Sequence, residues 1–233
     1  MSNIHAVKAT TKDGRALRYR HRRPELLRAV ADYVLARGVS NLSLRRVAAA
    51  VGVSHAALIG HFSSKDAMIV EALERIAADV VASVDDFEAV SMPTVEGMLW
   101  AIWRFQSDPP QLNHFRVFLE MASSSKYSRC ALVFSGGGET SVQVMANVWL
   151  SPVETRLVRD GWGASDAAAT ATTVVAQLRG LQLDLIMTGD RKRVEEAFAL
   201  VVHFVTERNR RMPRMSDAHA HPSSQGATPT EST

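Results

Sequence analysis

The chain has 233 residues, of which 46% are hydrophobic, so it is long enough to bury one large core or two modest ones. Its formal net charge of +3 is too small to indicate a class of partner by itself. No stretch approaches the roughly 20 uninterrupted apolar residues that span a bilayer, and no apolar signal core follows the basic N-terminus. We therefore expect a cytoplasmic protein without a membrane partner. Its single cysteine, Cys130, excludes an internal disulfide and is most simply a small buried hydrophobe.

Residues 1–23 are predicted to be a basic, flexible arm. They hold one acidic side chain, Asp13, against seven basic ones: Lys8, Lys12, Arg15, Arg18, Arg20, Arg22 and Arg23. Such a segment suits the neutralisation of phosphates, or the insertion of an arginine into a minor groove. The alternative is a solvated tail without a partner, above all for Lys8 and Lys12.

The pattern over residues 24–62 predicts three short helices. Pro24 and Glu25 are typical of a helix start, and Gly38 is typical of a helix end. Ser43 and Ser54 can cap two further helices, and Gly52 lies between them where the turn favours a positive φ. Two helices joined by so short a turn must cross steeply. This is the helix-turn-helix layout, which presents its second helix to the major groove of DNA.

The rest of the chain also has helical periodicity. A turn and cap at residues 63–66 precede a long helix at residues 66–84 that would link two domains. Pro93, the pair Pro109-Pro110 and the run at residues 135–138 interrupt the pattern. We predict further helices at residues 94–106, 110–123, 126–134, 139–160, 165–187 and 191–210. No sustained alternation of period two occurs, so the predicted fold is all-α, with a disordered tail at residues 212–233.

The segment LSLRRVAAAVGVSHAALIGHFSSKDAM resembles the N-terminal DNA-binding domain of TetR-family transcriptional regulators. The residues that match the family pattern are Ser43, Arg45, Val47, Ala48, Gly52, Val53, Ser54, Leu58, His61, Phe62 and Lys65. With the helix before it, the resemblance covers about residues 24–70. It implies a helix-turn-helix domain at residues 24–67, followed at residues 68–211 by a larger helical domain for effector binding and dimerisation.

The resemblance also implies roles in binding double-stranded DNA. Backbone contacts would come from Ser43 and Lys65, with backbone N–H groups at the helix start marked by Ser54. Base contacts would come from Arg45, His55, Ala56 and Ile59, while Arg18, Arg20, Arg22 and Arg23 of the arm would add phosphate or minor-groove contacts. His61 is expected either to contact phosphate or to pack beside Phe62. Ile59 departs from the family pattern, because the family usually has a tyrosine there, which can donate a hydrogen bond to the DNA backbone.

Regulators of this type bind two half-sites, so a homodimer on a palindromic operator is expected. In the family the last two helices commonly form a four-helix bundle with those of the partner, and the apolar stripes at residues 174–186 and 194–205 suit this. The alternative for these stripes is an intramolecular core alone.

Large, soft side chains in the middle helices suit a pocket for a small, hydrophobic or aromatic effector, although any one of them can equally be core. The candidates for ligand binding are Met98, Ile102, Trp103, Phe118, Met121, Met145, Trp149 and Gln177. Other polar residues that could orient an effector are Gln106, Asn113, His114, Gln143 and Asn147. Effector binding would shift the helix at residues 66–84 and so release the protein, acting as a repressor, from its operator.

No catalytic constellation, metal site or cofactor is predicted. The glycines at residues 136–138 lack the Gly-Lys-Ser/Thr ending of a phosphate-binding loop, and no G-x-S-x-G elbow occurs. The eight histidines are scattered, and His219 and His221 fall in the predicted tail. The alternative to a regulator is an all-α small-molecule-binding protein or enzyme in which the helix-turn-helix is only structural.

Overall fold

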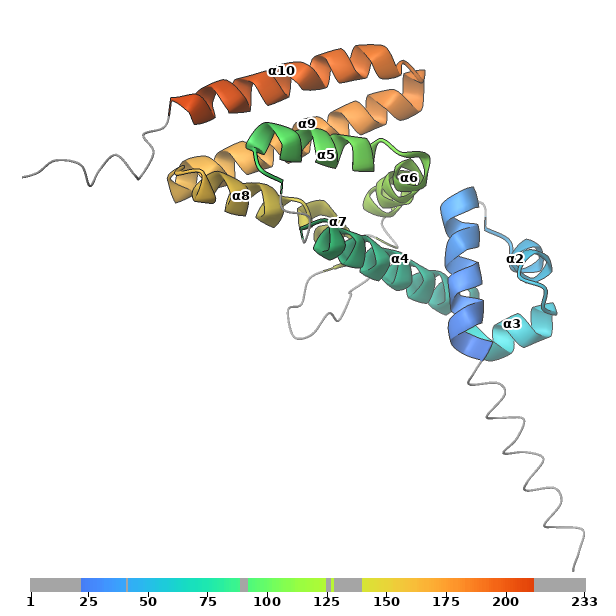
Figure 1. Ribbon diagram of the computed structural model, residues 1–233. Helices are drawn as coiled ribbons and strands as arrows, with labels where there is room; N and C mark the ends of the chain where they lie inside the picture. The colour runs from blue at the N-terminus through green and yellow to red at the C-terminus, as the bar shows by residue number, and fades with distance from the viewer. Residues whose placement is uncertain (1–21, 41, 89–91, 125–126, 128–139, 212–233) are drawn as a thin grey trace, which may run out of the picture.

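The computed structural model describes residues 22–40, 42–88, 92–124, 127 and 140–211 (Figure 1). Within these ranges the chain is helical and holds no β-strand, which confirms the all-α prediction. Most of the basic arm, the helix predicted at residues 126–134, Cys130 and the tail lie outside them. Of the described helices, none has the length and apolar character that crossing a membrane requires.

The N-terminal unit is built from a helix at residues 22–37, α2 (Leu44–Ala50) and α3 (His55–Phe62). Gly52 has a φ of 71° in the turn between α2 and α3, as its position predicted. Ser54 caps α3, its Oγ accepting a hydrogen bond from the Ala57 backbone N–H at 3.1 Å. Ser43 occupies the capping position of α2 but makes no side-chain cap bond. The three helices share a core that includes Val30, Val34, Val47, Leu58 and Phe62.

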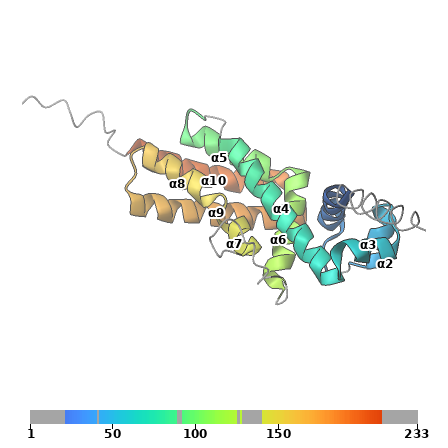
Figure 2. The same ribbon diagram turned by 90° about the horizontal axis from the view of Figure 1, so that it is seen from below.

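Helix α4 (Lys65–Glu88) connects the two ends of the molecule and is slightly longer than predicted. Its start is capped by Ser64, whose Oγ accepts a hydrogen bond from the Ala67 N–H at 3.0 Å. The first half of α4 buries Met68 and Leu73 in the N-terminal core, and Val84 near its end joins a second core. Figure 2 shows this helix running diagonally from the N-terminal unit across the larger one.

The C-terminal unit consists of the remaining described helices. They are α5 (Val95–Gln106), α6 (Pro109–Ser123), α7 (Ser141–Asn147), α8 (Leu150–Arg159), α9 (Ala164–Thr188) and α10 (Arg191–Arg210). Gly189, with a φ of 70°, ends α9, and the Asp190 side chain caps α10, so the last two helices lie side by side (Figure 1). Trp103 of α5 stacks on Phe198 of α10 in the core, with 5.2 Å between ring centroids.

The prediction of a single helix over residues 139–160 is wrong. The chain turns at residues 148–149, between α7 and α8. Pro152 explains the break, because it has no N–H to donate to the carbonyl of Val148 four residues earlier and its ring would clash with that carbonyl. Near the start of α8 the same proline is tolerated, because the first N–H groups of a helix have no partner within the helix.

Helix α6 belongs to both units. Val117 and Met121, in its second half, are fully buried in the N-terminal core with Leu73 and Ile76 of α4. The first half of α6 lies among the helices of the C-terminal unit, where Leu112 packs against the second core. A displacement of α6 would therefore disturb the packing of the N-terminal unit.

Truncation of Leu58 tests the core of the N-terminal unit. Leu58 is fully buried between α2, α3 and α4. We expect Leu58→Ala to lower the free energy of unfolding by about 2–5 kcal/mol, because the lost methyl groups leave a cavity. Denaturant unfolding followed by circular dichroism measures this loss. The matched control is Ala56→Ser, an exposed position on the same helix, which should change stability by no more than about 0.5 kcal/mol. A loss below about 1 kcal/mol for Leu58→Ala would contradict this packing.

Candidate nucleic-acid interface and ligand pocket

The helix-turn-helix presents a polar face to solvent. Arg45 of α2 and His55 and Ala56 of α3 are exposed, while Leu58 and Phe62 point into the core. Ile59 is partly buried, and Gly60 beside it is exposed. A glycine inside a helix costs about 1 kcal/mol relative to alanine. The predicted groove residues Arg45, His55 and Ala56 are thus accessible on adjacent short helices, and Ile59 offers only apolar surface.

The expected phosphate contacts are in different surroundings. Lys65 is exposed at the start of α4, and Ser43 is partly buried before α2. His61 is partly buried, and burial lowers its pKa, with Arg23 and Arg22 adding to the effect by charge repulsion. A lowered pKa keeps the imidazole neutral at pH 7 in the absence of DNA. This favours the packing alternative for His61.

The last two residues of the basic arm, Arg22 and Arg23, have different surroundings. Arg22 is exposed, whereas Arg23 pairs with Glu71 of α4, with 2.6 Å between Nη2 and Oε2. Arg23 also donates from Nε to the His61 carbonyl at 3.4 Å and lies over the Phe62 ring, 5.6 Å from its centroid. Arg23 therefore holds the first helix to α3 and α4. Arg18 and Arg20 lie outside the described residues.

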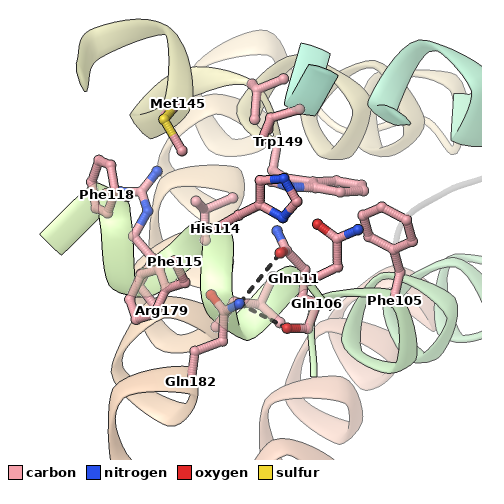
Figure 3. Close-up of a pocket in the computed structure, with 14 residues that line it drawn as sticks. Phe105, Gln106, Gln111, His114, Phe115, Phe118, Met145, Trp149, Arg179 and Gln182 are labelled. Atoms are coloured by element: carbon pink, nitrogen blue, oxygen red, sulfur yellow. Dashed lines mark hydrogen bonds between the residues drawn. The ribbon is translucent and has the colours of Figure 1, made fainter. Parts of the chain in front are cut away.

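A pocket lies between α4, α5, α6, α7 and α9 (Figure 3). Its free volume is about 40 Å³, room for a few water molecules. The residues that line it are Val80, Phe105, Gln106, Gln111, His114, Phe115, Phe118, Met145, Val148, Trp149, Val175, Leu178, Arg179 and Gln182. A ligand larger than a few waters requires the side chains around this space to move apart.

Phe118, Met145 and Trp149 of the predicted ligand-binding set line this pocket, as do Gln106 and His114 among the polar candidates. Other members of the set lie elsewhere. Met98, Ile102 and Trp103 are in the core of the C-terminal unit and Met121 is in the core of the N-terminal unit. Gln177 is exposed on α9. The residue types had suggested one shared pocket, but the side chains lie on helix faces that point to different parts of the structure.

The sequence analysis did not include Gln111, Arg179 and Gln182, which line the pocket. Residues 178 and 182 are one turn apart on α9, and Leu178 belongs to its apolar stripe. A glutamine at residue 182 therefore falls on the buried face, and Gln182 is only 2% exposed. These residues could have been identified as polar side chains that lie within, or next to, an otherwise apolar stripe of a helix.

Hydrogen bonds fix part of the pocket wall. Gln182 Nε2 donates to the Gln106 carbonyl at 2.9 Å and lies 3.3 Å from the Gln106 side-chain oxygen (Figure 3). His114 Nδ1 lies 2.9 Å from the carbonyl of Pro110, one turn earlier on α6. Burial lowers the pKa of His114, although this hydrogen bond opposes the effect. A neutral His114 that donates from Nδ1 leaves Nε2 as an acceptor.

A carboxylate on α6 ties the two units together. Glu120 Oε2 accepts hydrogen bonds from the Val39 N–H at 2.7 Å, the Ser40 N–H at 3.0 Å and the Ser40 hydroxyl at 3.0 Å. These residues lead from the first helix into α2, which carries Arg45. A side chain at Gly38, which has a φ of 75°, would collide with Glu120. Helix α6 thus joins the pocket to the segment that positions the helix-turn-helix.

The outer faces of α9 and α10 expose large apolar side chains. Met187 is 75% exposed, Leu200 is 71% exposed and Phe204 is 59% exposed, with Leu183 nearby on α9 at 38%. Exposed apolar side chains of this size on two adjacent helices are candidates for burial in an interaction. The inner faces of the same helices supply Val174, Leu178 and other core residues.

Comparison with known families gives a sequence match in the N-terminal unit. Residues 26–72 match the model of the bacterial regulatory proteins of the tetR family. No curated protein matches the chain.

Three solved structures illustrate the similarity of fold. A transcriptional regulator from Rhodococcus sp. Rha1 is 21% identical with a TM-score of 0.60, and the alignment covers 79% of this chain and 96% of that one. The reduced form of E. coli NemR is 16% identical with a TM-score of 0.59, covering 77% and 94%. A TetR transcriptional regulator from Legionella pneumophila is 15% identical with a TM-score of 0.57, covering 78% and 94%.

At these identities the solved structures show a shared fold, and the sequence match lies in the helix-turn-helix. Among the described residues, no cluster of histidine, cysteine or carboxylate side chains could hold a metal ion. Residues 26–72 thus match the DNA-binding domain of the tetR family, and the chain shares its fold with solved transcriptional regulators.

Proposed function

We propose that this protein is a dimeric repressor that binds a palindromic DNA operator and is released by a small, largely apolar effector. The observation that carries the proposal is the exposure of Arg45, His55 and Ala56 on a helix-turn-helix that matches the family model. Arg45 has the fork of donors that reads guanine, and Ala56 can contact a thymine methyl. The proposed location is the cytoplasm, where the protein would meet its DNA operator.

Phosphate contacts would come chiefly from Lys65, Arg22 and the arm before it. Both named side chains are exposed, and Arg22 has no ion pair among the described residues. Arg23, by contrast, is already paired with Glu71. Ile59 cannot donate a hydrogen bond to the DNA backbone, so the cationic side chains carry a larger share of the affinity in this proposal.

The dimer would form through the outer faces of α9 and α10. Leu183, Met187, Leu200 and Phe204 are exposed in the single chain, and their burial against a second copy would be favourable. A two-fold axis through this interface would give the dimer two helix-turn-helix units for two half-sites. The division between DNA binding and the effector and dimer functions would fall within α4, because Met68 and Leu73 pack in the N-terminal core and Val84 packs in the second core.

Effector binding would act through α6 and α4. A ligand that enters the pocket must separate its walls, and His114, Phe115 and Phe118 all come from α6. Movement of α6 would pull on the Glu120 contacts with Val39 and Ser40 and disturb the packing of Val117 against α4. The effector can release DNA only if it binds the two arrangements with different affinity.

The salt dependence of DNA binding tests the proposed function. We expect the chain to select a palindromic sequence from random duplex DNA. Its affinity for that sequence should fall by roughly 10³- to 10⁵-fold between 50 and 200 mM salt, if the dimer neutralises about six to ten phosphates. Fluorescence anisotropy at several salt concentrations measures this slope. The absence of salt-dependent binding to any duplex would contradict the regulator proposal.

Two substitutions in the same assay separate base reading from phosphate contact. Arg45→Ala should relax the preference at one base pair of each half-site, at a cost of about 1–3 kcal/mol on the preferred operator. Lys65→Ala should weaken binding to all sequences alike and make the salt slope shallower. The same loss of sequence preference in both variants would contradict these roles.

The dimer interface can be disrupted by charge. We expect the double variant Leu200→Glu and Phe204→Glu to be a monomer, because burial of two carboxylates in an apolar interface is costly. Sedimentation velocity measures the mass, and operator affinity should fall with it. Thr155→Glu, an exposed position on α8, adds a carboxylate elsewhere and should leave the dimer intact. A double variant that stays dimeric would place the interface on another surface.

The Glu120 contact can be followed by hydrogen exchange. Glu120→Ala removes the acceptor for the Val39 and Ser40 amides, so their exchange should become roughly tenfold faster or more. Mass spectrometry of exchanged peptides resolves this segment. Glu96→Ala, an exposed carboxylate on α5, is the matched control and should leave it unchanged. Equal exchange in both variants would show that Glu120 does not hold the segment.

A further inference from the structure

The pocket contains one strongly basic side chain without a partner. Arg179 projects from α9 into the lining, where it is partly buried. Neither a hydrogen bond nor an ion pair joins Arg179 to another described residue. The other arginines of the C-terminal unit that face the protein are held in place. Arg156, for example, donates to the carbonyls of Met92 and Pro93 and pairs with Asp160, and Arg191 donates to Ser107.

The surroundings of Arg179 hold no compensating charge. None of the described residues that line the pocket is acidic. His114 is neutral at pH 7 because burial lowers its pKa, so Arg179 is the charged member of the lining set. Burial also lowers the pKa of the Arg179 guanidinium, which reflects the cost of keeping its charge in this position. An anion that entered the pocket would meet this charge in partly buried surroundings, where attraction is stronger than in bulk water.

An aromatic pair and the charged side chain lie apart in the pocket. In the view of Figure 3, Phe105 and Trp149 lie on one side of the lining residues and Arg179 and Phe118 on the other. Phe105 and Trp149 contact each other with 5.7 Å between ring centroids. Gln106, Gln111 and Gln182 add neutral polar groups. This arrangement suits a molecule that has an apolar body and one acidic end.

We propose that the effector is a small organic acid, whose carboxylate pairs with Arg179 and whose apolar body lies against Phe105 and Trp149. The planar guanidinium can hold a carboxylate through two parallel hydrogen bonds. This inference rests on the proposed function, and it narrows the expected effector from an apolar molecule to an amphipathic anion. A neutral molecule of the same size would leave the arginine unpaired and lose this interaction.

Matched pairs of acids and amides test the proposal. The probes are 3-phenylpropanoate with 3-phenylpropanamide, and octanoate with octanamide, and calorimetry with the full chain gives each dissociation constant. We expect at least one acid to bind tenfold or more tightly than its amide. Arg179→Met should abolish that difference, and Arg179→Lys should retain part of it. Arg104→Met, an exposed arginine on α5, is the matched control and should keep the full preference.

Two results would overturn the proposal. One is that neither acid binds more tightly than its amide to the unaltered protein. The other is a preference for the acid that persists in Arg179→Met, provided that its thermal unfolding shows a folded protein. DNA binding in the absence of any probe is measured on the same preparations. If that binding is present while the acids fail, only the effector class is wrong. If the acids bind through Arg179 but DNA does not bind, the proposed function is wrong.

Discussion

The structure depends on the contact that α6 makes with the N-terminal unit. Glu120 satisfies two backbone N–H groups and one hydroxyl between the first helix and α2, while Met121 next to it is fully buried in the same core. The buried Met121 side chain and the hydrogen-bonded carboxylate together hold the segment more firmly than either would alone. Because other residues of α6 line the pocket, a change there cannot be confined to the C-terminal unit.

The sequence predicted the elements of this fold better than their contacts. Gly52 and Ser54 specify the tight turn locally, so the helix-turn-helix could be predicted from a few residues. The break between α7 and α8 was missed, although Pro152 has a clear local effect, because the apolar pattern continues across it. Glu120 could not have been identified, since its partners at residues 39 and 40 lie 81 and 80 positions away and only the packing of α6 brings them together.

The pocket shows the same limit of sequence reasoning. Large, soft residues were a fair guide to its surroundings, but such residues also fill ordinary cores, and Trp103 and Ile102 do so here. Arg179 was not considered because it follows directly on a core leucine. Its significance comes from what surrounds it in space, a lining of apolar and neutral polar side chains without acidic groups. An unpaired charge in a pocket is more informative about the ligand than apolar surface is. Burying a charge without a partner is costly, and a ligand of opposite charge would remove that cost.

Helix α9 has one further consequence. Its inner face contributes Leu178, Arg179 and Gln182 to the pocket, and its outer face carries Leu183 and Met187. In a dimer built on that outer face, a ligand that repositions α9 in one protomer also changes the surface on which the other protomer's α9 rests. The two pockets would then be thermodynamically linked, so the first ligand alters the affinity for the second. The steepness of the response to effector concentration would therefore be set at the same helix that, in the proposal, contacts the effector.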